Sequence, residues 1–171
     1  MIGIWEGNAT LAHSHLLENR ADYGGGLTLN DRPNFTVPAT VNLYSTLVQS
    51  NTATVGGGLF NYGGYLYLHN AWVAQNRAGS GGGISSLHII NEAGDAYQTS
   101  TLYSYSTIFY NNEALSSHGG AVYSTGYLAV ENSFFQGNQA AQRGSAVLVT
   151  VLRPPSLCPA RHRPLSARLP G

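Results

Sequence analysis

A short pattern recurs five times along the chain: Asn, any residue, Ala, a gap of a few residues, then a cluster of small residues that precedes an apolar one. The second copy is Asn51-Thr52-Ala53 before Gly56-Gly57-Gly58-Leu59. The copies begin at Asn19, Asn51, Asn76, Asn112 and Asn138, which are 32, 25, 36 and 26 residues apart. A repeat of about this length is typical of solenoids, in which each unit must be covered by its neighbours. The repeated residues are therefore expected to build a scaffold, and function is expected to depend on the residues that are not repeated.

The residues before each Asn alternate in character. Counted back from the Asn of repeats two to five, two inward columns are mostly apolar: Val41, Leu66, Leu102, Leu128 at position −10 and Leu43, Leu68, Ser104, Val130 at position −8. Position −6 continues the alternation with Ser45, Asn70, Ser106 and Asn132. This alternation predicts a strand with one buried and one exposed face. The first repeat fits loosely, as though one residue were missing.

Two further strands are expected in each repeat. Position −3 is apolar in all five copies: Leu16, Val48, Val73, Phe109 and Phe135. A third strand begins at each Gly cluster. When repeats stack, equivalent strands pair in parallel about 4.8 Å apart. The sequence thus predicts an all-β, right-handed parallel β-helix (solenoid) of about five coils over residues 1–151, a fragment of a longer solenoid, followed by a disordered Pro/Arg-rich tail over residues 152–171. Regular Asn-Gly or Asp-Gly hairpins, which a barrel or sandwich would need, do not occur.

The two most regular residue types have a structural explanation. Glycine turns corners and allows close chain approach. A buried Asn amide can hydrogen-bond to the same amide one layer away, as in other stacked assemblies. We therefore expect a structural ladder formed by Asn19, Asn51, Asn76, Asn112 and Asn138.

Charge and hydropathy exclude several functions. Charged residues are only 9% of the chain, and residues 1–152 carry four Arg against eight acidic residues. A weakly acidic body argues against a nucleic-acid partner. No stretch of about 18 apolar residues that could span a membrane is present, and the segment after Met1 lacks a signal-peptide pattern. No cofactor motif is found.

Roughly residues 9–150 resemble the repeats of polymorphic outer membrane proteins, which are adhesin-like autotransporter passengers. Two motifs mark that family, Gly-Gly-Ala-Ile and Phe-x-x-Asn. The second is matched at Phe109 to Asn112 and at Phe135 to Asn138, and Gly119-Gly120-Ala121-Val122 comes nearest to the first. The resemblance implies a β-helix of the broad pectin-lyase-like class, located outside the cell or on its surface, with an adhesin-like role.

Aromatic side chains are concentrated on the outward side of the expected first strand. The column Tyr44, His69, Tyr105 lies beside Tyr67 and Tyr103. Aromatic rings on a flat sheet can bind a carbohydrate or a protein partner. Alternatively, they pair across strands and stabilise the sheet.

Two insertions lengthen the repeats, roughly at residues 30–39 and 87–100. Both follow the Gly-cluster strand, so they are expected at the same edge, about 10 Å apart by the layer spacing. They carry Asp31, Arg32, Glu92 and Asp95. Brought together, these groups would suit a Ca²⁺ site or acid–base chemistry, as in a pectin-lyase-like polysaccharide lyase or hydrolase. The alternative is ordinary solvated loop charge. Because the carboxylates share no column, the sequence favours a non-catalytic scaffold.

One pair of His residues has the spacing of a possible metal site. His13 and His15 would place two imidazoles on one strand face, as in a Zn²⁺ site. No third ligand stands nearby, so no metal is expected there.

Overall fold

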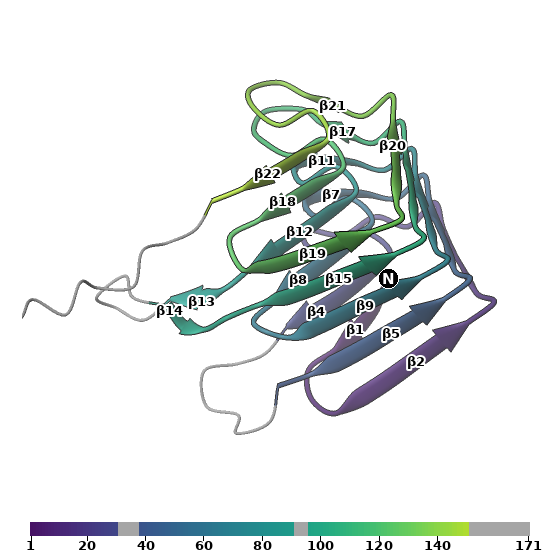
Figure 1. Ribbon diagram of the computed structural model, residues 1–171, viewed down its shortest axis with the longest axis vertical. Helices are drawn as coiled ribbons and strands as arrows, with labels where there is room; N and C mark the ends of the chain where they lie inside the picture. Colours follow the sequence, from purple (N-terminus) through teal and green to yellow (C-terminus); the bar gives the residue numbers. More distant parts are fainter. Residues whose placement is uncertain (31–37, 91–95, 151–171) are drawn as a thin grey trace, which may run out of the picture.

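The computed structural model describes residues 1–30, 38–90 and 96–150. Within these ranges the chain forms strands and turns and no helix. Four parallel sheets run along the stack (Figure 1). Sheet A consists of β1 (Ile2–Ile4), β4 (Leu27–Asn30), β8 (Leu59–Tyr62), β12 (Ile84–Leu87), β18 (Val122–Ser124) and β22 (Val147–Val149). Sheet B consists of β2 (Asn8–Ala12), β5 (Thr40–Tyr44), β9 (Tyr65–His69), β15 (Thr101–Tyr105) and β19 (Tyr127–Glu131).

The other two parallel sheets are made of shorter strands. Sheet C consists of β3 (His15–Leu17), β6 (Leu47–Gln49), β10 (Trp72–Ala74), β16 (Ile108–Tyr110) and β20 (Phe134–Gln136). Sheet D consists of β7 (Thr52–Val55), β11 (Arg77–Ser80), β17 (Glu113–Ala114) and β21 (Gln139–Ala140). A separate antiparallel pair is formed by β13 (Ile89–Ile90) and β14 (Ala96–Gln98).

Each strand pairs with its equivalent in the next coil, and the register follows the sequence columns. Leu66 lies opposite Leu102, and Leu102 lies opposite Leu128. The prediction of an all-β parallel β-helix is confirmed. The first repeat also pairs in full register, with Ala9 opposite Val41 and Leu16 opposite Val48. The expectation that the first repeat lacks a residue was wrong. Its strand β2 is complete, but it is made of polar and small residues, so the apolar alternation is weak there.

A full coil has four strands, one more than expected. The additional strand follows the ladder Asn, as β7 does after Asn51. It was missed because its residues, Thr52-Ala53-Thr54-Val55, are short and mostly polar or small, so they give little apolar alternation.

Three turns of each coil contain a residue in the left-handed conformation: one is the first Gly of each Gly cluster, with φ between 54° and 68°, and the other two lie at positions −6 and −1. At position −6 these are His13, Ser45, Asn70, Ser106 and Asn132, with φ between 46° and 52°. At position −1 they are Glu18, Ser50, Gln75, Asn111 and Gly137. The inclusion of position −6 in the strand was therefore wrong: the strand ends one residue earlier, and the chain turns there. Short polar side chains tolerate this conformation better than branched ones.

The interior is filled by aligned apolar columns and by one row of amides. Leu43, Leu68 and Phe109 are fully buried. Phe109 stacks on Phe135, with ring centroids 4.6 Å apart and planes 5° apart. Such close packing between layers is where most of the favourable burial energy of a solenoid arises.

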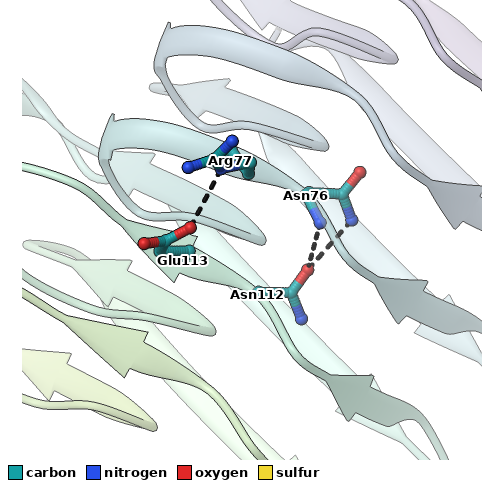
Figure 2. A network of polar contacts seen from close by, with 4 residues as sticks. All are labelled: Asn76, Arg77, Asn112 and Glu113. Atoms are coloured by element: carbon teal, nitrogen blue, oxygen red, sulfur yellow. Dashed lines mark hydrogen bonds and ion pairs between the residues drawn. The ribbon is translucent and has the colours of Figure 1, made fainter.

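The row of amides is formed by the five repeated Asn residues. Figure 2 shows the contact between two of them, Asn76 and Asn112. The backbone N and the Nδ2 of Asn76 both donate to Oδ1 of Asn112, at 3.1 and 3.0 Å. The same Nδ2 also donates to the carbonyl of Val48 at 2.9 Å. Asn51 donates to Asn76 in the same way. Each interior amide thus uses its full hydrogen-bonding capacity, which makes its burial tolerable.

Candidate functional site: an aromatic face on sheet B

The outward side of sheet B carries an aromatic surface that we call the tyrosine face, made of Tyr44, Tyr67, His69, Tyr103 and Tyr105. Strand alternation places these residues outward because positions −10 and −8 fill the interior. Strand pairing then aligns Tyr44, His69 and Tyr105 in one row, and Tyr67 and Tyr103 in the next. The structure brings all five side chains of this candidate surface together on one sheet.

Two pairs of rings in the tyrosine face stack on one another, whereas His69 and Tyr105 are tilted, with centroids 6.4 Å apart and planes 49° apart. Tyr44 and His69 have centroids 4.7 Å apart with planes 11° apart. Tyr67 and Tyr103 have centroids 5.2 Å apart with planes 4° apart. These pairs stabilise the sheet, as one of the two interpretations of the sequence proposed. In the two stacked pairs the facing ring surfaces cover each other, so these pairs offer mainly ring edges and polar ring atoms to a partner.

Tyr65 and Tyr127 extend the tyrosine face and were not singled out in the sequence. They occupy position −11, one residue before the columns that were counted, and are 37% and 52% exposed. Counting one position further back would have found them. Tyr127 lies against Tyr103, with centroids 5.5 Å apart, and its hydroxyl raises the pKa of Tyr103 because it favours the protonated phenol.

A small hollow of about 180 Å³ interrupts the tyrosine face above Ala129. It forms because Ala129 follows Tyr103 in the row and leaves the space of one ring unfilled. Tyr105 and Glu131 border this hollow. A carboxylate beside aromatic edges suits a partner that donates hydrogen bonds or carries a positive charge.

The loop residues of the candidate site, Asp31, Arg32, Glu92 and Asp95, lie outside the described residues. Their flanking strands are described: one insertion follows β4 and the other follows β12. These strands are both in sheet A, separated only by β8. The insertions therefore leave the same edge two layers apart, and a polysaccharide-active site on them stays a prediction.

The expectation that His13 and His15 share one strand face was wrong. His13 turns the corner with φ of 49°, between β2 and β3, and His15 begins β3. Among the residues that the structure describes, no group of three or more His, Cys, Asp or Glu side chains is arranged to hold a metal ion.

His88 is a buried titratable residue beside the second insertion. It is 8% exposed, and neither ring nitrogen has a hydrogen-bond partner among the described residues. Its backbone N donates to Oγ1 of Thr125 at 3.1 Å, which fixes its position between β12 and β13. Burial lowers the pKa of His88 below its ordinary value of 6.5, because desolvation penalises the charged ring.

This lowered pKa makes stability pH-dependent. As the pH falls below 6.5, the unfolded chain binds a proton at His88 before the folded chain does. We therefore expect the free energy of unfolding to fall in this window, by at most about 1.4 kcal/mol per pH unit from this residue. Urea unfolding between about pH 7.5 and about pH 5.5 measures the slope. His88→Leu should flatten it, and an unchanged slope in this variant would contradict the assignment.

The fold and this surface define a parallel β-helix with an exposed aromatic sheet. Residues 106–125, which include the Phe109 and Gly119 motifs, match the family model of the Chlamydia polymorphic membrane protein (Chlamydia_PMP) repeat. The prediction of repeats of this type is thereby confirmed for this part of the chain. No curated protein and no solved structure matches the chain. Within the described ranges, no helix has the length and apolar character needed to cross a membrane.

Proposed function

We propose that this chain is part of a cell-surface β-helix scaffold with an adhesin-like role, and that its tyrosine face binds a protein partner. The location is supported by the match of residues 106–125 to a repeat of polymorphic membrane proteins. The observation that carries the binding role is the exposure of aromatic residues on one sheet: Tyr44, Tyr105 and Tyr127 are 41%, 45% and 52% exposed. Tyrosine is enriched in protein interfaces because it combines apolar area with a hydroxyl group.

The geometry favours a protein over a carbohydrate at this face. Carbohydrate binding by aromatic residues uses the ring faces, and here the faces of Tyr67 and Tyr103 cover each other. Edges, hydroxyls and the Glu131 carboxylate remain available for hydrogen bonds and for cationic side chains. The interior amides and aliphatic side chains are buried in contacts between coils. Only the outward side chains are therefore accessible to a partner.

Adhesion of beads coated with the chain to a panel of cell types tests this proposal. We expect Tyr44→Ala combined with Tyr105→Ala to reduce adhesion about tenfold, the usual cost of removing interface anchors. Phe134→Ala is the matched control, because Phe134 is 55% exposed but lies on sheet C. Protease treatment of the cells should abolish adhesion. Loss only after glycosidase treatment, or equal adhesion by the double variant, would overturn the assignment of a protein partner to this face.

A further inference from the structure

A second hollow lies on sheet A, away from the tyrosine face. Its volume is about 830 Å³, within the range of about 300–1,000 Å³ typical of small-molecule sites. We call it the sheet A groove. Its lining includes Trp5, Asp22, Tyr23, Thr28, Phe60 and Tyr62.

The groove exists because the outward column of sheet A changes size between layers. Gly3 lies opposite Thr28, and Thr28 lies opposite Phe60. The first two coils therefore contribute the small residues Gly3 and Thr28 to the floor of the groove. The third coil contributes the ring of Phe60, which closes one end of it. Tyr23 leans on this ring, with centroids 5.2 Å apart and planes tilted by 37°. Phe60 and Tyr62 are nearly parallel, with planes 12° apart.

The wall of the groove is fixed by hydrogen bonds within its own coil and to the next coil. Oγ1 of Thr28 donates to the carbonyl of Tyr23 at 2.6 Å. The carbonyl of Asp22 accepts from the backbone N of Thr54 and of Val55, at 2.9 and 3.1 Å. A wall fixed in this way loses little conformational entropy when a ligand binds.

The chemistry of the lining selects the class of ligand. Trp5 and Tyr23 line the groove and are 48% and 54% exposed, so both present aromatic surface to a ligand. Asp22 is the one acidic side chain among the described lining residues, and no Arg, Lys or His is among them. The N-terminal ammonium of Met1 also lies in the lining, where it donates to Oδ1 of Asn19 at 3.1 Å. Acidic glycans, phosphates and sulfates are bound through Arg or Lys, so this lining disfavours them. A carboxylate accepts hydrogen bonds from hydroxyl groups, and aromatic rings cover apolar C–H faces.

We propose that the sheet A groove is a binding site for a neutral oligosaccharide. The aromatic residues cover the apolar faces of the sugar rings, and Asp22 accepts hydrogen bonds from their hydroxyl groups. This site is separate from the tyrosine face proposed to bind protein. The two proposals rest on different residues and are tested by different experiments.

Titration of the full chain with neutral and acidic glycans tests the proposal. The probes are maltohexaose, cellohexaose and chitohexaose, with polygalacturonate and heparin as the acidic set. The chain contains two Trp residues, so the Trp72→Phe variant reports on Trp5 fluorescence alone. We expect at least one neutral probe to change this fluorescence in a saturable way, and the acidic probes to leave it unchanged.

Matched variants then locate the site. Trp5→Ala and Tyr23→Ala should each weaken binding measured by calorimetry about tenfold, the scale expected for aromatic anchors. Trp72→Ala is the control, because Trp72 is also 48% exposed but lies on sheet C. Thermal unfolding of each variant shows that it is folded. Binding of no neutral probe, binding of acidic probes only, or equal losses for Trp5→Ala and Trp72→Ala would overturn the proposal. None of these outcomes bears on adhesion through the tyrosine face.

Discussion

Replacing Asn76 by Ala should destabilise the fold by about 3–5 kcal/mol. The substitution removes the acceptor of two hydrogen bonds from Asn51, both 3.0 Å long, and the donor to the carbonyl of Val48. Asn51 and Asn76 are fully buried, so water cannot replace these bonds. Each unsatisfied buried group costs about 1–3 kcal/mol, and the total is a large part of the stability of an ordinary domain. Urea unfolding at neutral pH measures the difference.

Two companion variants identify the cause. Asn76→Asp keeps the acceptor but places a carboxylate oxygen against Oδ1 of Asn112 and the carbonyl of Val48. Its folded form should favour the protonated acid, so this variant should lose less stability near pH 5 than at pH 7. Asn42→Ala is the control: Asn42 faces outward on sheet B and should change stability by less than about 0.5 kcal/mol. A loss of that small size for Asn76→Ala would contradict the role of the amide row.

The second large effect is expected from Gly82→Ala. A Cβ at Gly82 would lie 2.5 Å from the carbonyl oxygen of Gly120 and 2.5 Å from the backbone N of Glu113. Both atoms belong to the backbone of the next coil, so the layers would have to separate. We expect a loss of at least about 3 kcal/mol or failure to fold, because overpacking cannot be relieved by a side-chain rotation. Thermal and urea unfolding measure the loss.

Gly7→Ala separates overpacking from backbone strain. Gly7 has φ of 79°, but a Cβ there would meet nothing within 4 Å. Strain alone should cost about 1–2 kcal/mol. If Gly7→Ala and Gly82→Ala were equally destabilising, close approach of the coils would not be the reason for the repeated glycines.

The fold could be predicted because the register between neighbouring strands follows from the spacing of the repeats. In a stack of coils, equivalent residues lie above one another, so Leu66 and Leu102 can be paired by counting from Asn76 and Asn112. The corners could not be read in the same way. Ser45 and Asn70 are polar, as an outward strand residue would be, and only the backbone reveals that they turn the chain at φ of 46° and 52°.

The two surfaces differ in how far the sequence reveals them. The tyrosine face lies within regular columns, so its members follow from the same count. The sheet A groove combines Gly3, Tyr23 and Phe60 from different coils. Tyr23 lies in the gap between the ladder Asn and the Gly cluster, where the repeats differ in length. Tyr23 and Phe60 occupy different positions in successive repeats, so aligning equivalent positions of the repeats does not predict their contact.

The stacking of coils also has a mechanical consequence. The hydrogen bonds between coils run along the stacking direction, and each coil is held mainly by its two neighbours. Force applied between the two ends would detach the outermost coil first and leave the others intact. The interior coil from Asn51 to Asn76 spans 25 residues, so its release, once the coils on one side of it have detached, would add roughly 85 Å of extended chain. A surface scaffold of this design would lengthen stepwise under flow and dissipate the load before its attachment breaks.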